Sequence, residues 1–464
     1  MTTKKSIREV LYPRSVAVVG ASNTPPKIGY YVFKSLQNFQ GDIFPINPNV
    51  DQVQGVKTYK SLSDLPKPVD LAIICVPAEK VPLIVEEAAK LNIKGLVIIS
   101  AGFKEAEYNV GKALQEKISK ILEHANLRII GPNIFGIVNL DHGLNASFTP
   151  SFSELNKGDI SIVAQSGGVC HRIMHIALNE GIGLNKIIHL GNRVDVDFPE
   201  VIDFLRRDKG TNVIVVHIEG VESGRELFDA IKRAAKVKRV VVLKTGRSSV
   251  ADRASLSHTG SLAGDYNVFR DIILQAGATI VSDIYSLVDI AYAYSVLRGK
   301  MLADGGIAII SFQAGIGIIA SDVVESEGAK LASLSEETLR EIKEVLPPIT
   351  HRNNPVDVSF AALNVEVLQN VLEIILNDEN VSVVLFTYIM PKHWPIDPKY
   401  IGLVSAKYNK PIIAGISTRA DKIKELRKKF EKYRIAYYPC PERAARVAAT
   451  LYLEHREGRI GNTI

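Results

Sequence analysis

Cysteine is scarce in this chain: Cys75, Cys170 and Cys440 lie far apart among 464 residues, and no CxxC pair occurs. This usage is typical of reduced core thiols and argues against a disulfide-stapled secreted protein. Apolar runs are short, because none reaches the ~18 residues that a membrane-spanning helix needs. The polar start Met1–Lys5 is not followed by the apolar core of a signal peptide. We therefore expect a cytoplasmic protein with no membrane partner.

No block of one charge dominates the sequence, whose net charge of +6 is spread along the chain. A basic cluster at Lys422–Arg434 lies in a lysine-rich helical stretch, and such runs are usually solvated helix faces. Nucleic acid is therefore not an expected partner. Hydrophobic residues at 46% and charged residues at 23% are ordinary for a globular protein. The length exceeds that of a single core, so we expect about two to four domains.

A proper GxGxxG fingerprint is missing from the first strand–turn–helix, Val16–Gly29. Gly20 lets the backbone turn, and the start of the next helix offers N–H groups to a phosphate. An NAD site would also need an acidic residue at the end of the second strand. That strand, Gly41–Pro48, has Pro45 or Asn47 at this position. The sequence therefore argues against an NAD-dependent dehydrogenase.

Short runs rich in Val, Ile and Leu recur along the chain without polar alternation, as expected for strands covered on both faces. The predicted strands are Ser15–Val19, Leu71–Val76, Gly95–Ser100, Asp159–Val163, Val213–Ile218, Val240–Lys244, Gly306–Ser311, Val381–Thr387 and Pro411–Ile416. The helical segments between them include Val81–Leu91, Gly111–Ala125, Arg225–Val237 and Leu363–Leu376. Their alternation predicts doubly wound α/β layers.

Three units are expected, at residues 1–143, 144–300 and 301–464. An internal echo supports the last division, because Asp159–Gly168 resembles Gly306–Gly315. Both segments place small residues between a buried strand and a helix. The second and third units are therefore predicted to be two similarly built open sheets.

Later strand ends of the first unit carry Cys75–Pro77, Ser100–Phe103 and Gly131–Asn133. Ligands of open α/β sheets bind beyond the carboxyl ends of the strands, where these segments are expected. Taken one at a time, Pro77 and Pro132 are explained by strand termination alone. Taken together, the three segments favour a ligand of the size of coenzyme A.

The segment Leu256–Gly264 presents His258 between Ser, Thr and Gly, outside any apolar period. Neutral imidazole is nucleophilic near pH 7 and can accept a phosphoryl group, and small neighbours would let a loop move it. The spacing alone favours an ordinary surface histidine over a phosphoryl acceptor. Glu219 follows the strand Val213–Ile218, where its carboxylate could hold one ring nitrogen of the histidine or simply face solvent.

A second small-residue turn, Ala164–Gly168, follows a strand and precedes a helix. Ser166 with the amides of Gly167 and Gly168 is predicted to cradle an oxyanion at that helix start. A serine hydrolase is not favoured, because its GxSxG motif needs glycine where Ala164 stands.

His171 and His175 share one helix face at i,i+4 spacing, but Arg172 stands where HExxH needs glutamate. We interpret them as packing or interface histidines and expect no metal site.

Together with these strand ends, Ser257–Gly264 resembles a specific motif of the nucleoside-diphosphate-forming acyl-CoA synthetases. The closer resemblance is to the α subunit of the archaeal ADP-forming acetyl-CoA synthetases (acetate–CoA ligases), which are related to succinyl-CoA synthetase. It covers essentially the whole chain. It implies a Rossmann-like CoA-binding domain followed by two flavodoxin-like, doubly wound parallel-sheet domains.

The resemblance also implies a mechanism. Acyl-CoA and phosphate give an acyl phosphate and free CoA, and the phosphoryl group passes to His258, whose loop carries it to ADP on an ATP-grasp subunit. Glu219 then orients the histidine, and Ser166, Gly167 and Gly168 hold phosphate. The residues implied to contact CoA are Gly20, Ala21, Ser22, Lys27, Asn47, Val76, Pro77, Ser100, Gly102 and Asn133.

No ATP-grasp segment is recognised in the chain, so the expected partner is an ATP-grasp β subunit, in an α₂β₂ assembly, that supplies ATP or ADP and Mg²⁺. Three positions depart from the family pattern: the turn Ser311–Gly315, Ile134, and Cys170–Arg172 after the phosphate cradle. The acyl group, the physiological direction and the nucleotide preference stay open. A CoA-responsive regulatory or scaffold subunit is the alternative, although such a protein has no need for both His258 and Glu219.

Overall fold

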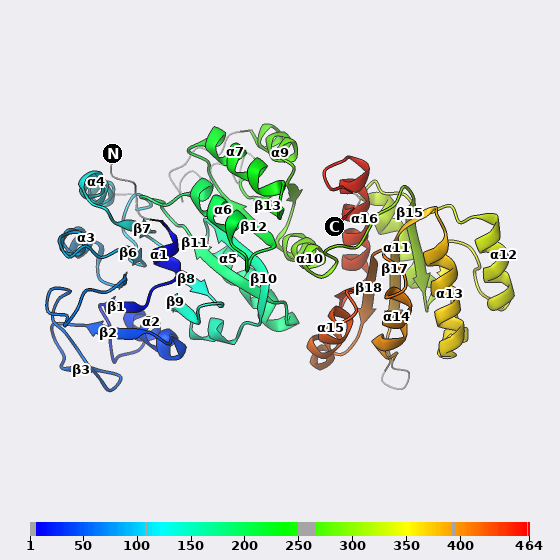
Figure 1. Ribbon diagram of the computed structural model, residues 1–464, viewed down its shortest axis with the longest axis horizontal. Coiled ribbons are helices and arrows are strands. Elements are labelled where there is room, and N and C mark those ends of the chain that lie inside the picture. Colours follow the sequence, from blue (N-terminus) through cyan, green and yellow to red (C-terminus); the bar gives the residue numbers. More distant parts are fainter. Residues whose placement is uncertain (1–5, 107–108, 249–264, 392–395, 462) are drawn as a thin grey trace. The chain divides into compact units, whose positions relative to one another are not determined.

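The structure is a computed structural model that describes residues 6–106, 109–248, 265–391, 396–461 and 463–464. Strands and helices alternate along the described chain (Figure 1), which confirms the predicted α/β class. The chain divides into two compact units. They consist of Met1–Leu178 with Ile182–Ile284, and of Asn179–Gly181 with Tyr285–Ile464.

The first sheet has five parallel strands in the order β2-β1-β5-β6-β7. They are Asp42–Ile46 (β2), Ser15–Val19 (β1), Leu71–Ile74 (β5), Gly95–Ile98 (β6) and Arg128–Ile130 (β7). The helices here are Arg8–Leu11 (α1), Ile28–Ser35 (α2), Val81–Lys90 (α3) and Asn109–His124 (α4), beside a ribbon of Gln52–Val53 (β3) and Val56–Lys57 (β4). The strand order reverses between β1 and β5, which is where sheets of this kind hold ligands.

The second sheet has seven strands in the order β14-β13-β12-β10-β11-β8-β9. They are Thr279–Val281 (β14), Arg239–Lys244 (β13), Val213–Ile218 (β12), Lys157–Ala164 (β10), Leu184–His189 (β11), Gly136–Asn139 (β8) and Leu144–Ser147 (β9). Its helices are Gly167–Glu180 (α5), Phe198–Arg207 (α6), Gly224–Ala235 (α7) and Tyr266–Gln275 (α9). β8 and β9 pair antiparallel, and the order of the parallel strands reverses between β10 and β12.

The third sheet has five parallel strands in the order β16-β15-β17-β18-β19. They are Val356–Asp357 (β16), Gly306–Ser311 (β15), Val381–Ile389 (β17), Ile412–Ser417 (β18) and Ala436–Tyr438 (β19). The helices of the second unit are Ile284–Val296 (α10), Ala314–Ser326 (α11), Glu336–Val345 (α12), Val365–Asn377 (α13), Pro398–Ser405 (α14), Ile423–Glu431 (α15) and Pro441–Arg456 (α16). This strand order is that of flavodoxin-like folds.

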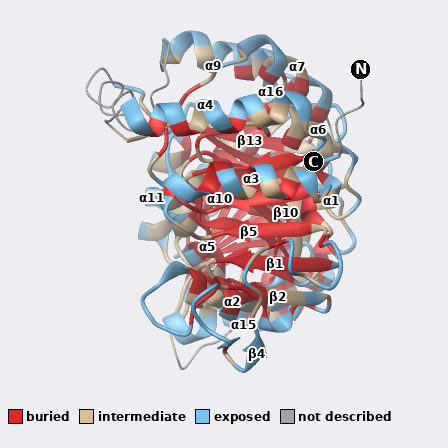
Figure 2. Ribbon diagram, turned by 90° about the vertical axis from the view of Figure 1, so that its left-hand side faces the viewer, coloured by how far each residue is buried: buried red, intermediate tan, exposed pale blue. Residues whose placement is uncertain are grey.

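Burial explains why the predicted strands form. Every residue of β1, β5, β6, β12 and β15 is buried. Figure 2 shows the strands of the first unit buried between helices that expose one face. Apolar runs without alternation suit this two-sided cover. The predicted strands are therefore confirmed, with ends that differ by one or two residues, and the echo of Asp159–Gly168 in Gly306–Gly315 corresponds to β10–α5 and β15–α11.

Strand β11 escaped sequence analysis because a charged residue lies within it. The Lys186 side chain is fully buried, and its Nζ lies 2.7 Å from Asp208 Oδ2. Asn185, the preceding residue, donates to the Gly158 carbonyl oxygen over 3.0 Å. Buried charges persist only when they are paired, and here the pairing occurs in a strand whose apolar run is interrupted. On the far side of this strand, β8 joins the second sheet although it precedes residue 143.

Arg128 ties the first sheet to the second within the first unit. This arginine, 3% exposed on β7, donates from Nε to Asp195 Oδ2 over 2.9 Å and from Nη1 to Glu200 Oε1 over 2.6 Å. The Ile129 N–H donates to the same Asp195 oxygen over 2.9 Å. Two carboxylates neutralise the guanidinium, and its pKa is raised by these hydrogen bonds despite burial. The segment after β7 therefore begins from a fixed position.

Close approach of two backbones makes Gly29 a sensitive position. A Cβ atom on Gly29 would lie 1.9 Å from the Gly20 carbonyl oxygen, so Gly29→Ala must push α2 away from the turn after β1. We expect this overpacking to lower the free energy of unfolding by about 1–3 kcal/mol. Gly224→Ala is the control, because its Cβ would come no closer than 4.0 Å to Val221. Urea denaturation of both variants checks this, and an equal stability of the two would contradict it.

Candidate active site

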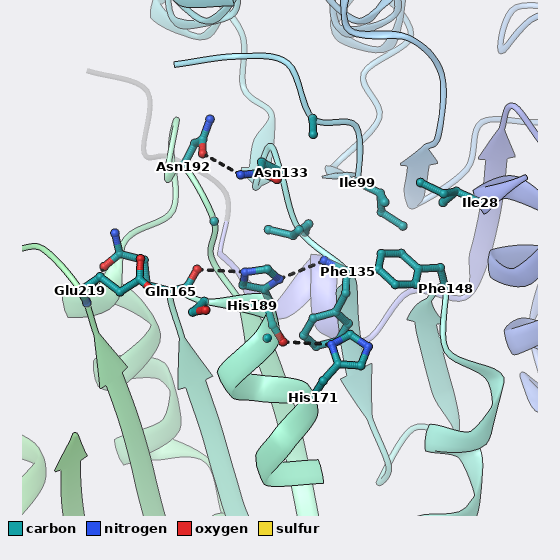
Figure 3. A pocket seen from close by; sticks show the side chains of 16 residues that line it. Ile28, Ile99, Asn133, Phe135, Phe148, Gln165, His171, His189, Asn192 and Glu219 are labelled. Carbon is teal, nitrogen blue, oxygen red and sulfur yellow. Dashed lines mark hydrogen bonds between the residues drawn. The ribbon is translucent and has the colours of Figure 1, made fainter. Parts of the chain in front are cut away.

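A cavity of about 400 Å³ lies in the first unit, where strand ends of the first and second sheets meet (Figure 3). Its lining includes Asn133 after β7, Ser166–Gly168 after β10, His189 and Asn192 at and after β11, and Glu219 after β12. Such a volume is within the usual range of small-molecule sites. The cavity therefore joins the predicted phosphate cradle, the predicted glutamate and one of the predicted CoA contacts.

The residues predicted to form the phosphate cradle, Ser166–Gly168, lie at the turn between β10 and α5. Helix α5 begins at Gly167, so the first N–H groups of this helix have no carbonyl one turn earlier to receive them. A Cβ on Gly168 would meet nothing within 4 Å, which leaves open space at the helix start. Gly167 differs, because its Cβ would lie 2.9 Å from His189 Cε1. Space beside a helix N-terminus suits an anion.

Gln165 links the turn after β10 to the end of β12, and sequence analysis did not single it out. Its side-chain Oε1 accepts the N–H groups of Glu219 over 3.0 Å and Gly220 over 3.1 Å. Lys244 Nζ donates to the Glu219 carbonyl oxygen over 2.7 Å. The backbone of Glu219 is therefore fixed from both sides at the end of β12. The sequence did offer a signal for Gln165, because it is a polar residue between a buried strand and a Ser-Gly-Gly turn.

His189 was also missed, and it links three segments. Its ring stacks on Phe135 at 5.0 Å between centroids, and its Nδ1 accepts the Phe135 N–H over 2.9 Å. Its Nε2 lies 2.9 Å from the Gln165 carbonyl oxygen, to which it must donate. The ring is therefore neutral, with its hydrogen on Nε2. Burial lowers the pKa of His189 to about 3.

His217, on β12, is the second buried histidine beside the cradle. Strand register places both His189 and His217 opposite Ala164, the last residue of β10. Burial, with His189 and Lys244 nearby, lowers the pKa of His217 to about 3. Both rings are therefore uncharged at neutral pH.

His171 packs among aromatic side chains and also faces the cavity. Its ring centroid lies 4.9 Å from that of Phe135 and 5.9 Å from that of Phe148. Nδ1 lies 2.9 Å from the Gly167 carbonyl oxygen, so it donates, and Nε2 accepts from Thr149 Oγ1 over 2.9 Å. Burial lowers the pKa of His171. This geometry fixes a neutral tautomer that contacts the first turn of α5.

Asn133 and Asn192 both line the cavity, where the segments after β7 and β11 come into contact. Asn133 has a positive φ of 62°, and its N–H donates to the Ser100 carbonyl oxygen over 2.9 Å. Asn192 donates its N–H to the Pro132 carbonyl oxygen over 3.0 Å. A Cβ on Gly191 would lie 2.4 Å from that same oxygen. The close approach therefore depends on glycine between β11 and α6.

The remaining predicted CoA contacts gather along the carboxyl edge of the first sheet. Gly20 turns with a φ of 91°, Asn47 Nδ2 donates to the Ala21 carbonyl oxygen over 2.8 Å, and Ser100 Oγ donates to the Val76 carbonyl oxygen. Of the ten residues predicted to contact CoA, Asn133 lines the cavity. Ser22 is buried, Gly102 is half-buried, and Pro77 and Lys27 are exposed, with Lys27 immediately before α2.

His258 and the whole Ser257–Gly264 motif lie outside the residues that the structure describes. Within residues 6–106, 109–248, 265–391, 396–461 and 463–464, no cluster of three or more His, Cys, Asp or Glu side chains could hold a metal ion. Over the same residues, no helix is long and apolar enough to cross a bilayer.

Sequence profiles match the chain in two stretches. The CoA binding domain matches residues 14–139, and the succinyl-CoA ligase like flavodoxin domain matches residues 157–294. The chain is 35% identical to subunit alpha of acetate–CoA ligase (ADP-forming) II from Pyrococcus furiosus, over 95% of this chain and 96% of that subunit.

A longer relative and a solved structure are also similar. The chain is 38% identical to the acetate–CoA ligase (ADP-forming) of Methanocaldococcus jannaschii over 76% of its own length, a match that spans only 49% of that relative. The solved structure is the dinucleotide forming acetyl-coenzyme A synthetase 1 of Ca. Korarchaeum cryptofilum, in complex with phosphate and ADP. It has a TM-score of 0.85 and 29% identity, and 97% of each chain is covered.

The neutral state of His189 predicts a pH dependence of stability. Below about pH 6.5 an unfolded histidine binds a proton, whereas folded His189 does not until about pH 3. Stability contributed by the neutral ring is therefore present above pH ~6.5 and is lost as pH falls, at about 1.4 kcal/mol per pH unit. Glutamine can accept and donate in its place without titrating. We expect His189→Gln to show a shallower fall in the free energy of unfolding between about pH 6 and pH 4, measured by urea denaturation. A slope equal to that of the wild type would contradict it.

Proposed function

This chain belongs to the family of ADP-forming acetate–CoA ligase α subunits, and we propose that it binds CoA and relays the phosphoryl group in an ADP-forming acid–CoA ligase. The observation that carries the proposal is that Glu219 and the N-terminus of α5 line one cavity, with Gln165 holding the backbone after β12 beside the helix start. A carboxylate and an anion cradle are the two groups that a phosphohistidine relay needs side by side.

The first proposed step takes place at the cradle. An oxygen of phosphate attacks the thioester carbonyl of acyl-CoA, the carbon–sulfur bond breaks, and the CoA thiolate leaves. The helix start of α5, with Ser166 and Gly168, holds the phosphate in place and stabilises charge on its oxygens. Neutral His171 and His189 add no positive charge that would trap the anion.

In the second proposed step His258 receives the phosphoryl group. A ring nitrogen of His258 attacks phosphorus, the bond to the acyl oxygen breaks, and the carboxylate leaves. Glu219 accepts a hydrogen bond from the other ring nitrogen, which keeps the attacking nitrogen unprotonated and stabilises the charged product. The phosphoryl group then passes to ADP, and every step is reversible.

CoA is proposed to lie along the carboxyl edge of the first sheet, with its thiol end toward Asn133. Gly20 turns the backbone with a positive φ, and Gly29, which has no side chain, lies close to the Gly20 carbonyl oxygen. Both glycines let the backbone come close to a ligand at the start of α2. Lys27, exposed before that helix, is placed to pair with a CoA phosphate.

The nucleotide and Mg²⁺ are proposed to bind on an ATP-grasp β subunit in an α₂β₂ assembly. The name of the Pyrococcus furiosus relative, subunit alpha, implies a second subunit there. The longer Methanocaldococcus jannaschii relative extends well beyond the matched half. Cys75, Cys170 and Cys440 are free thiols, which supports a cytoplasmic location.

Phosphoryl labelling tests the relay. The chain is mixed with its β subunit, Mg²⁺ and ATP labelled at the terminal phosphate, without CoA or acid. We expect acid-labile label on the wild type and none on His258→Ala. Glu219→Gln removes a hydrogen bond to a charged ring and should slow labelling by about 10- to 100-fold.

Glu222→Gln is the matched control for the second variant. Its carboxylate belongs to the same loop but lies 3.0 Å from Lys104 Nζ and does not line the cavity. We expect it to label at the wild-type rate. Label that persists on His258→Ala would assign the phosphoryl group to another residue. If all variants and the wild type stay unlabelled with a competent partner, a CoA-responsive regulatory subunit becomes the better account.

Ligand-dependent melting tests the CoA site of the chain by itself. Free CoA should raise the melting temperature by mass action, whereas NADH should not. Lys27→Ala removes an exposed charge at the start of α2 and should weaken CoA binding severalfold, with a smaller thermal shift. Lys34→Ala, in the last turn of the same helix, should keep the wild-type shift. Equal losses in both variants would contradict the placement of CoA.

A further inference from the structure

The second unit has a cavity of about 420 Å³ that no step of the proposed relay uses. It lies beyond the carboxyl ends of β17 and β18, which is the edge where open α/β sheets hold ligands. Its lining residues follow those two strands or belong to α14 and α15, two helices that contact each other (Figure 1). The volume is within the usual range of small-molecule sites.

Part of this lining is apolar. Ile396 is 9% exposed and Leu426 7% exposed, and Pro398 is buried. Met390 comes directly after β17, and its N–H donates to the Ser417 carbonyl oxygen over 2.9 Å, so this part of the lining is attached to the sheet. A thioether and branched apolar side chains pack well against an aromatic ring. The apolar part therefore suits a planar ring.

Arg419 brings unused hydrogen-bond donors to the same cavity. Its Nε donates to Asp421 Oδ1 over 3.0 Å, and its two terminal amino groups have no hydrogen bond among the described residues. These groups are the ones that pair with phosphate oxygens. Asp397, another acid of the lining, is occupied as the cap of α14, where it accepts the Lys399 N–H over 3.0 Å.

Glu425 does not cancel the charge of the lysines beside it. Its Oε2 accepts from Lys422 Nζ over 2.8 Å, and its Oε1 accepts from Lys429 Nζ over 2.8 Å. Hydrogen bonds from these two lysines lower the pKa of Glu425 to about 2. One carboxylate therefore faces two ammonium groups, and the three side chains together carry one positive charge near neutral pH.

The exposed face of α15 adds to this positive charge. Lys424 and Lys428 are exposed and have no ion pair among the described residues, because Glu425 pairs with Lys422 and Lys429. This face belongs to the basic cluster Lys422–Arg434, which the sequence explained only as a solvated helix face. A cluster of one charge beside a cavity raises the local concentration of ligands of the opposite charge.

We propose that this cavity binds a nucleotide, whose aromatic ring contacts Met390 and Leu426 and whose phosphate groups pair with Arg419 and Lys429. Neither part of the ligand accounts for the lining alone. Inorganic phosphate would leave the apolar side chains uncovered, and an uncharged ring would leave the cations unused. The site goes beyond the proposed function, because it shares no residue with the cavity at α5 and adds a nucleotide site to the one proposed on the β subunit.

The test uses the full chain without the β subunit, with ADP, adenosine and pyrophosphate as probes. Equilibrium dialysis measures each affinity. The fluorescence of Trp394, the single tryptophan of the chain and two residues from Ile396 in the sequence, gives a second readout. We expect ADP to bind at least about tenfold more tightly than adenosine or pyrophosphate, because its ring and its phosphates both contribute. A second series contains saturating CoA, which fills the proposed CoA site of the first unit.

Two variants assign the parts of the site. Arg419→Ala should weaken the binding of ADP and of pyrophosphate about tenfold, because a hydrogen bond between charged groups is lost. Arg340→Ala, on α12 and outside the lining, is the matched control, since both arginine side chains are 68% exposed and each pairs with one carboxylate. Met390→Ala should weaken ADP about threefold to tenfold. It should leave pyrophosphate binding unchanged, which also shows that the variant is folded.

The proposal is overturned if ADP does not bind, or if Arg419→Ala binds ADP as tightly as Arg340→Ala does. Pyrophosphate or adenosine that binds as tightly as ADP also overturns it, because the ring and the phosphates then do not act together. If CoA leaves ADP binding unchanged, free nucleotide is the ligand. If CoA removes ADP binding and Arg419→Ala loses one of two CoA sites, the site holds and its ligand is the nucleotide end of CoA.

Discussion

The site depends on one neutral histidine. His189 accepts the Phe135 N–H at Nδ1 and donates to the Gln165 carbonyl oxygen from Nε2, so it joins the segment after β7 to the end of β10. Its ring also lies against the first residue of α5, where a Cβ on Gly167 would come within 2.9 Å. A proton on Nδ1 would set two donors against each other and break the first of these bonds. The predicted cradle, the segment that contains Phe135 and the turn after β10 that contains Gln165 therefore share one support.

Arg128 supplies the same segment with a second anchor. The Arg128 guanidinium pairs with Asp195 and Glu200 and so fixes the start of this segment. His189 fixes its other end at Phe135. Asn133, which lies between these anchors, adopts a positive φ that few residues other than glycine take. A segment fixed at both ends keeps such a conformation without a ligand. Preorganisation of this kind reduces the entropy lost when reactants are brought together.

Much of this arrangement could be predicted from local patterns, and the rest depends on contacts distant in sequence. Apolar runs predicted β1, β12 and β15, and small residues predicted the cradle at Ser166–Gly168, because both signals are local. Strand β11 was missed because Lys186 interrupts its apolar run. Asp208, the residue that pairs with Lys186, is 22 residues away, so no local pattern reveals the pair. His189 ends that strand, so it was missed with it. Its partners Phe135 and Gln165 lie just before β8 and just after β10, and no spacing rule relates them to His189.

The described cavity contains few groups that can exchange a proton, and this limits the chemistry that it can perform alone. Among the described lining residues, only Glu219 carries a carboxylate. Gln165 and Lys244 fix the Glu219 backbone from both sides. His171 and His189 have both ring nitrogens engaged, so neither presents a nucleophilic nitrogen to a ligand. The cavity can bind and orient an anion beside a fixed carboxylate, which is stabilisation by position and charge. The proposed relay therefore takes its phosphoryl acceptor from outside this described lining, and in that proposal the Glu219 carboxylate orients the acceptor.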